Sequence, residues 1–457
     1  MIKRLATIAA TALWAVAAHA QNTVDIPIAQ AGPLAVQALQ RGDTALAVAV
    51  AEAILAARPD DLTALLVIAA GAPRVGDPAR GQAAGARAYR LSQTPEERYE
   101  AARLTALAAS IGERFTTATF WLRLALISAP NEAERARTIT DARTVTARNP
   151  LQLQVFASLA PSSNVNGGAE SAISSAPGNP DGLLSEDAVA LEGWRASLGL
   201  GASYRLQESR ESRTTVSLNL RASRVRITEE TTVPDEAFAS GSVEASLRHE
   251  RVLGEGLLGL TFGLGQFDYR DLGGDFTTTE YETYSVARLQ ADYRMALSPE
   301  MTLSLTAGHE SLSYEAAGIG EVDRNRLGAT LDYRLASGDR LSLSADLAKS
   351  SADSPNYVSQ EGGLRLGYSL AEPVGPVTLS AFAGYRWADY PEYRLLNAVT
   401  GGRQDETAFA SISLGFPQVE FAGFVPGLQI DASKTQSNVS RFDRTSLGAS
   451  LTIQSSF

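Results

Sequence analysis

The sequence has no cysteine, so disulfides, thiolate metal sites and cysteine nucleophiles are excluded. Only three histidines occur, and once His19 is set aside within the N-terminal apolar segment, too few remain for a histidine-rich metal site. Beyond that segment no apolar run is long enough for a transmembrane helix, so the chain can cross a membrane only as a closed β-barrel. Clustered positive charge is also missing. The formal net charge is −11, which makes nucleic acid an unexpected partner.

The N-terminus has the features of a secretory signal peptide. Lys3 and Arg4 precede an apolar stretch from Leu5 to Ala17, and Ala18-His19-Ala20 fits the small-residue cleavage rule. We therefore expect residues 1–20 to be removed and residues 21–29 to form a linker. Because no cysteine follows, the mature protein is not expected to be a lipoprotein itself.

Residues 30–148 have the spacing and composition of helices, with much Ala, Leu, Arg and Glu and few aromatics. A period of about 35 residues runs through the region. We expect each repeated glycine to allow close helix packing and each repeated proline to start a helix. These features predict a periplasmic domain of tetratricopeptide-like repeats, and a plain helical bundle is the alternative. The repeated positions are Gly42, Gly76, Gly112, Pro59, Pro95 and Pro130.

From residue 149 to residue 457 apolar and polar residues alternate with a period of two, as in the segment from Trp194 to Tyr204. Short turns such as Ser337-Gly338-Asp339 also alternate with long polar connections such as 160–189 and 389–405. Together these patterns predict a fourteen-stranded antiparallel transmembrane β-barrel, an even number that suits a bacterial outer-membrane protein. The expected strands start near residues 151, 190, 213, 239, 256, 284, 299, 324, 339, 360, 375, 406, 423 and 443. The fold class is thus α+β, with helical repeats followed by a barrel.

Aromatic residues stand where strands are expected to meet the membrane interfaces, with the parity of the apolar face. The terminal Phe457 also resembles the signal by which the barrel-assembly machinery recognises its substrates. The expected periplasmic girdle is Tyr204, Tyr293, Tyr333, Tyr368, Phe416 and Phe457, and the expected outer girdle is Trp194, Tyr385 and Trp387.

The opposite parity carries many charged residues, mostly arginines, which are expected to line the lumen. Two interpretations stay open: a salt-bridge lattice in a wet lumen, or a charged wall that guides a polypeptide or small solutes. The predicted lumen residues are Arg195, Arg205, Arg221, Arg248, Arg288, Asp292, Arg294, Arg326, Asp332, Arg334, Arg365, Arg386 and Asp431.

His309 and Ser311 share one strand face, and Asn325 is expected on the next strand, opposite Ser311. Such a set is the kind of arrangement that outer-membrane phospholipases use. Leu312-Ser313 follow where that family has Asn-Gly, and a repeat domain is foreign to it. Catalysis at these residues is therefore a distant alternative, and the protein is expected not to be an enzyme.

The order of parts resembles the surface lipoprotein assembly modifiers, the Slam family, which have a signal, a periplasmic tetratricopeptide-like domain and a fourteen-stranded barrel. Local similarity lies in 147–150, 160–166 and 437–444, and in Phe120-Trp121-Leu122-Arg123 before Ala129-Pro130. The resemblance implies transfer of client lipoproteins from the periplasm to the cell surface. It supplies no catalytic motif.

We therefore expect an outer-membrane translocation protein that needs no cofactor or metal. The expected partners are membrane lipid, a client lipoprotein and the barrel-assembly machinery. The alternatives are a polysaccharide-export barrel, in which periplasmic repeats also precede a barrel, and a passive porin, which needs no helical domain.

Overall fold

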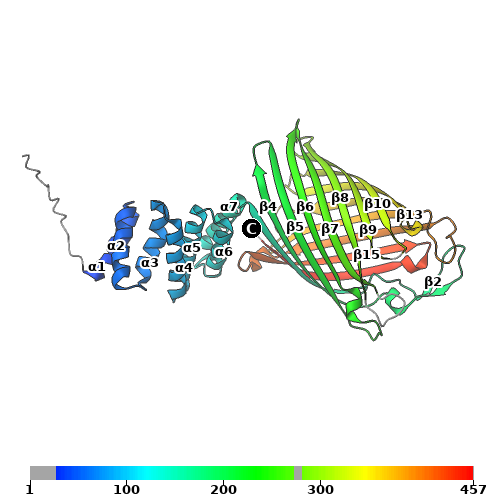
Figure 1. Cartoon of the computed structure of the whole chain (residues 1–457), viewed down its shortest axis with the longest axis horizontal. Coiled ribbons are helices and arrows are strands. Elements are labelled where there is room, and N and C mark those ends of the chain that lie inside the picture. Colours follow the sequence, from blue (N-terminus) through cyan, green and yellow to red (C-terminus); the bar gives the residue numbers. More distant parts are fainter. Residues whose placement is uncertain (1–26, 272–279, 317, 456–457) are drawn as a thin grey trace, which may run out of the picture. The chain divides into compact units, whose positions relative to one another are not determined.

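The computed structural model describes residues 27–271, 280–316, 318–455. The chain divides into two compact units, Met1–Gly112 and Glu113–Phe457. In the first unit the described residues form helices and the turns between them, and the second unit holds two further helices and the β-barrel (Figure 1). The division at Gly112 lies before the change from helix to strand, which occurs after Arg148.

The first unit is a series of short helices that begin at capped turns. The side chains of Asp43, Asp61, Asp77 and Thr94 each accept a hydrogen bond from a backbone N–H in the first turn. Its core is rich in alanine and leucine, so the helices pack closely. The elements are α1 (Ile28–Gln40), α2 (Thr44–Ala57), α3 (Leu62–Gly71), η1 (Ala72–Val75), α4 (Pro78–Leu91) and α5 (Pro95–Ile111).

The structure corrects the role expected for two of the three repeated glycines, whereas Gly112 does lie close to a neighbouring helix, where a Cβ would meet Pro78 at 3.3 Å. Gly42 and Gly76 have φ of 86° and 92°, so they end helices in a left-handed conformation that favours glycine. Close helix packing instead requires Gly85, where a Cβ would collide with the Thr105 side chain on α5. Pro95 does begin a helix, whereas Pro59 and Pro130 lie in the turns before the helices that start at Leu62 and Glu132.

In the second unit α6 (Phe115–Ile127) and α7 (Glu132–Arg148) precede the barrel. Helices α2, α4 and α6 begin at residues 44, 78 and 115, close to the period of about 35 residues in the sequence. The tetratricopeptide character of these helix pairs stays a prediction.

Fourteen antiparallel strands form the closed barrel, each beside its sequence neighbours in the sheet, which confirms the predicted architecture. They are β1 (Leu151–Ser162), β4 (Gly193–Glu208), β5 (Ser212–Ile227), β6 (Ser240–Leu253), β7 (Gly256–Asp271), β8 (Glu280–Ala296), β9 (Met301–Tyr314), β10 (Glu321–Arg334), β11 (Arg340–Ala352), β12 (Ser359–Ser369), β13 (Thr378–Tyr390), β14 (Arg403–Gly415), β15 (Phe424–Ser437) and β16 (Arg444–Ser455).

The connections hold small elements that the sequence did not predict. Strands β2 (Ile173–Ser174) and β3 (Gly182–Leu183) pair within the connection from β1 to β4. A short helical turn, η2, lies in the same connection, and in the described ranges four other connections hold one each. They are η2 (Glu186–Ala188), η3 (Asp235–Phe238), η4 (Pro355–Tyr357), η5 (Pro417–Val419) and η6 (Ser440–Phe442).

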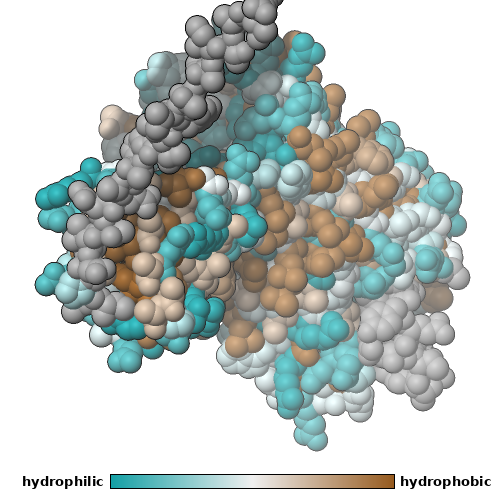
Figure 2. Space-filling view, turned by 60° about the vertical axis from the view of Figure 1, so that its left-hand side comes forward, coloured by the Kyte–Doolittle hydropathy of each residue, from teal (hydrophilic) through white to brown (hydrophobic). Residues whose placement is uncertain are grey.

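Alternation along each strand separates two faces of the barrel wall. Leu198 and Leu200 are 50% and 45% exposed, and large apolar residues of the other strands are exposed in the same way. Figure 2 shows these apolar residues gathered on the outer surface of the barrel. Such a continuous apolar surface suits lipid rather than water. No helix in the described ranges is long and apolar enough to span a membrane.

The seam that closes the barrel has little pairing. Among the described residues, β1 and β16 have Cα partners at four positions, whereas β1 and β4 have partners at twelve. Because the wall is held by ladder hydrogen bonds, this seam is the weakest part of the described wall.

Candidate functional site in the barrel lumen

Ion pairs connect strands β6, β8 and β9 across the inward face. The Arg248 guanidinium donates to both carboxylate oxygens of Asp292 at 2.7 and 2.8 Å. This pair reaches across β7, where Gly259 leaves room, because a Cβ there would strike the Arg248 guanidinium. Arg288 likewise donates to Glu310 at 2.8 Å. Half-buried pairs of this kind hold the wall while keeping its inner surface polar.

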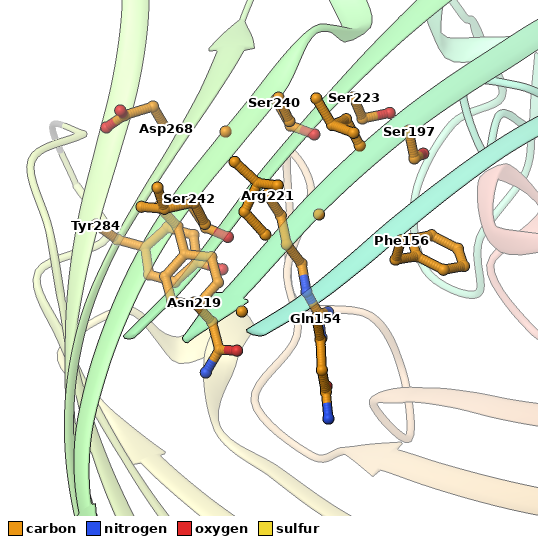
Figure 3. A pocket seen from close by; sticks show the side chains of 18 residues that line it. Gln154, Phe156, Ser197, Asn219, Arg221, Ser223, Ser240, Ser242, Asp268 and Tyr284 are labelled. Carbon is orange, nitrogen blue, oxygen red and sulfur yellow. The ribbon is translucent and has the colours of Figure 1, made fainter. Parts of the chain in front are cut away.

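A recess of about 670 Å³ lies on the inner wall of β1 and β4–β8. Its floor is smooth because glycine and serine, such as Gly199 and Ser197, occupy the inward positions. Figure 3 shows Gln154, Asn219 and Arg221 projecting from this floor. Arg221 forms no ion pair with any residue that the structure describes. The recess therefore offers an unneutralised guanidinium to an anionic group.

A row of aromatic rings crosses the inner wall near the long connections. The ring centroids of Phe267 and Tyr284 are 4.9 Å apart with nearly parallel planes, and Tyr284 stacks in the same way on Tyr314. Tyr357 of η4 continues the row at 5.6 Å from Tyr314. Phe267, Tyr284 and Tyr314 thus cover part of one another's faces, while Tyr357 is tilted by 51° against Tyr314.

The first long connection is tied to neighbouring connections around the rim. The backbone N–H of Ser440 donates to Ser175 at 2.9 Å, and that of Thr400 donates to Pro177 at 2.9 Å. On the other side Glu186 accepts from the Thr232 N–H at 3.1 Å. The Thr232 hydroxyl, which also donates to Glu186, lowers the pKa of that carboxyl. Residues 163–192 thus fasten a large sector of the rim.

Arg403 occupies an aromatic site beside this connection. Its guanidinium carbon lies 3.3 Å from the Phe442 ring centroid and 4.2 Å from that of Tyr390. Asp405 accepts from its Nε at 3.0 Å. This cation–π arrangement was not predicted, because its aromatic partners come from distant parts of the chain, the end of β13 and the turn η6.

At the end with short turns, arginines bind helices α6 and α7 to the barrel. Arg205 of β4 donates to the Ala147 and Asn149 carbonyl oxygens at 3.1 and 3.0 Å. Arg123 of α6 donates to the Ala422 carbonyl at 3.0 Å, and Arg135 of α7 to that of Glu420 at 2.7 Å. Burial lowers the pKa of Arg123, and the Glu420 carboxylate opposes that effect.

The predicted lumen residues fall into three groups. Arg248, Asp292 and Arg288 form the ion pairs described above. Near opposite ends of the wall, Arg195 donates to the Ser223 hydroxyl and Arg205 to the Asn149 carbonyl. Arg365 lies over the Phe382 ring at 3.6 Å, and Asp431 accepts from Gln429 at 2.9 Å. The remaining six form no ion pair within the described ranges. They are Arg221, Arg294, Arg326, Asp332, Arg334 and Arg386.

Several partners in the lumen were missed. They lie at inward positions, so the alternation along each strand could have identified them. The prediction was weighted toward arginine and left most glutamates out. The missed charged residues include Arg213, Glu250, Glu310, Arg324, Glu361, Arg403 and Asp405.

The structure places the predicted girdle aromatics with the apolar, exposed face. Tyr204, Tyr333 and Tyr368 are each at least 37% exposed, and so are Trp194, Tyr385 and Trp387. Two tyrosine hydroxyls bond near the short turns: Tyr293 donates to the Leu253 carbonyl and Tyr368 to Asp339. Phe416 is half-buried, and Phe457 lies outside the described residues.

The histidine site forms only in part. His309 Nδ1 lies 3.0 Å from Asn325 Oδ1. The expected place of Asn325 opposite Ser311 is wrong, because Asn325 pairs with His309 and Ser311 pairs with Asp323. His309 Nε2 faces Asp323 at 3.7 Å, and the described part of the chain has no hydrogen bond between Ser311 and His309. No cluster of metal-binding side chains occurs among the described residues.

A closed fourteen-stranded barrel with an apolar outer face and a charged inner wall is an outer-membrane β-barrel. Residues 266–457 match the model of the family named surface lipoprotein assembly modifier, which confirms the resemblance inferred from the sequence and a location in the outer membrane. The protein therefore has a role in the surface exposure of lipoproteins at that membrane.

Solved structures also show likeness to the barrel. The outer membrane channel DcaP of Acinetobacter baumannii is 12% identical, with 67% of this chain and 97% of that chain covered and a TM-score of 0.39. OmpT of Vibrio cholerae is 7% identical, with 67% and 97% covered and a TM-score of 0.35. No curated protein matches the chain in sequence.

Proposed function

We propose that this protein moves client lipoproteins from the periplasm across the outer membrane to the cell surface. The observation that carries the proposal is the match of residues 266–457 to the surface lipoprotein assembly modifier family. Outer-membrane barrels have short periplasmic turns and long outer connections, so helices α6 and α7, bonded at the short turns, belong in the periplasm. The client then enters from the helical side.

The inner wall supplies suitable contacts for an extended polypeptide. Glycine and serine keep the wall of the recess smooth, and Arg221 offers a charge for client carboxylates or backbone carbonyls. In this proposal the lumen arginines that lack an ion pair to a described residue guide the client, while the ion pairs of Arg248 and Arg288 hold the wall. Residues 27–112 collect the client, because packed helix pairs build an extended binding face.

A lipid anchor cannot leave through a wet lumen without exposing its acyl chains to water. It must pass through the wall, and the sparsely paired seam between β1 and β16 is the least costly place to open. We assign lateral release of the anchor to this seam.

Protease shaving of intact cells tests the function. Cells that express the full chain should expose a surface lipoprotein, and cells that lack the protein should retain it inside. The variant R221A should reduce exposure while the barrel remains in the membrane. D332A is the matched control, since Asp332 also lies on the inward face without an ion pair to any described residue. A loss of polymer secretion without an effect on lipoproteins would favour polysaccharide export. A change in small-solute uptake alone would favour a porin.

A further inference from the structure

Two neighbouring rows on the outward face of β8–β13 differ in their chemistry. Cross-strand partners define both rows, so each row follows the wall at one level. One row is apolar and holds three small residues: Ala291, Ala307, Leu327, Leu347, Gly362 and Trp387. The next row toward the long connections is polar: Leu289, His309, Asn325, Lys349, Gln360 and Asp389.

A groove of about 700 Å³ runs along these rows. Ala291 and Ala307 form a low floor, because their side chains end at Cβ. The Trp387 ring lies across Gly362, where any Cβ would collide with it, so the ring stands as one wall of the groove. The apolar part has the width and chemistry for an acyl chain.

The end of the groove nearer the long connections, which we call its head, carries the positive charge of Lys349. Lys349 is exposed and has no ion pair or hydrogen bond to any residue in the described ranges. The nearby Asp323 carboxylate faces His309 instead, at 3.7 Å. Asn325 accepts from His309 through Oδ1, which leaves its amide N–H groups pointing away from that bond. Lysine and amide donors at one place match an oxyanion.

Lysine itself is rare in this chain. Lys3, Lys349 and Lys434 are the only lysines, and every other basic residue of the sequence apart from histidine is arginine. Lys349 and Lys434 both face outward near the ends of their strands at the long connections. A lysine stem crosses apolar surface while its ammonium reaches the headgroup level.

The depth of the groove head agrees with that level. Asn325 and Tyr333 lie on the same face of β10, eight residues apart. A rise of about 3.3 Å per residue and a strand tilt of about 40° separate them vertically by roughly 20 Å. With Tyr333 at the periplasmic interface, Asn325 and Lys349 stand roughly 5 Å below the upper border of an apolar band about 25 Å tall, a distance that a lysine stem can bridge.

We propose that this groove binds a phosphorylated acyl lipid of the outer leaflet, with an acyl chain over Ala291 and Ala307 and a phosphate on Lys349. A neutral lipid would fill the apolar floor but leave the ammonium without a counter-charge. The site lies on the outer wall, so it is separate from the lumen that carries the client.

The chain provides an internal control for the test. Full-length protein in detergent micelles is titrated with diphosphoryl lipid A, and amine-reactive labelling of Lys349 and Lys434 is followed by peptide mass spectrometry. At a lipid concentration about ten times the dissociation constant, labelling of Lys349 should slow about tenfold. Labelling of Lys434, flanked in its row by Ala408 and Thr445, should be unchanged.

Two variants separate the phosphate contact from the acyl contact. K349Q and A307F should each reduce retained lipid A in native mass spectrometry, and K434Q should not. Heat-dependent gel migration shows whether each variant is folded. Equal protection of both lysines would overturn the proposal, because it indicates a general lipid annulus. Protection by a neutral diacyl lipopeptide as strong as that by lipid A would also overturn it, and would assign the groove to a client anchor.

Discussion

An arginine on the outer wall of β4 tests which face of the barrel meets lipid. Leu200 lies on the outward face and Ser197 lines the inner recess, only three residues away on the same strand. Leu200→Arg must place a guanidinium in hydrocarbon, whereas Ser197→Arg places it beside water in the lumen. The two variants have the same new side chain, so their difference isolates the environment.

The expected magnitude follows from depth along β4. Trp194 and Tyr204 are ten residues apart on one face, which corresponds to roughly 25 Å vertically at a tilt of about 40°. That span equals the height of a lipid-facing band, and Leu200 lies near its middle. Arginine there should cost about 2–4 kcal/mol, or roughly 30- to 1000-fold in the folding equilibrium. At Ala196, close to Trp194, the cost should fall to about 0–1 kcal/mol.

Reversible folding into lipid vesicles, followed by tryptophan fluorescence across a denaturant titration, measures these free energies. Leu200→Arg should unfold at a clearly lower denaturant concentration than Ala196→Arg, and Ser197→Arg should stay close to the parent protein. An equal loss at Ser197 and Leu200 would refute the assigned faces. An equal loss at Ala196 and Leu200 would refute the assigned depth.

Three further predictions test the seam, the ion pairs and a turn. Leu159→Cys with Leu451→Cys should crosslink the β1–β16 seam on oxidation and stop lipoprotein exposure, whereas Leu159→Cys with Ala196→Cys should crosslink β1 to β4 and leave it intact. Asp292→Ala should lower the free energy of unfolding by about 1–2 kcal/mol in a denaturant titration, because it removes two bonds from a partly exposed guanidinium, while Asp332→Ala should have little effect. The Ala371 N–H, the Tyr368 hydroxyl and Ser337 lower the pKa of Asp339. Asp339 therefore stabilises the fold above its unfolded pKa of about 3.9, and this effect is lost as pH falls through the lower folded pKa, so Asp339→Asn should destabilise the protein at about pH 7 but not at about pH 2.

The barrel could be predicted from the sequence because each strand carries its own signal. Alternation from Trp194 to Tyr204 assigns a face to every residue of β4, and a turn such as Ser337-Gly338-Asp339 marks where two strands join. The strands β2 and β3 were missed because two residues are too few for a period to show. The glycine role was mistaken at Gly42, since helix packing and helix termination both use glycine.

The partners within the lumen depend on register, which the sequence alone does not supply. Parity placed Arg248 and Asp292 on one face, but their bond spans a whole strand and requires the small Gly259 between them. The site of Arg403 depends on Tyr390 and Phe442 from separate parts of the chain. Contacts between connections form because the barrel is closed, so they can be assigned only once the order of the strands in the sheet is known.

The division between arginine and lysine follows from what each wall requires. Inside, Arg248 binds both oxygens of one carboxylate, and Arg403 lies flat on a ring, which a planar guanidinium permits and an ammonium does not. Outside, Lys349 and Lys434 stand three residues from the ends of β11 and β15, where a flexible stem must carry a compact charge past apolar side chains. The lysines and the inward arginines therefore report on different surfaces. Labelling of lysine side chains in the described barrel reads the lipid-facing wall, while substitution of an inward arginine such as Arg221 reads the lumen. An effect on client export that follows arginine changes alone would place the client inside, and one that follows Lys349 would place it on the outer groove.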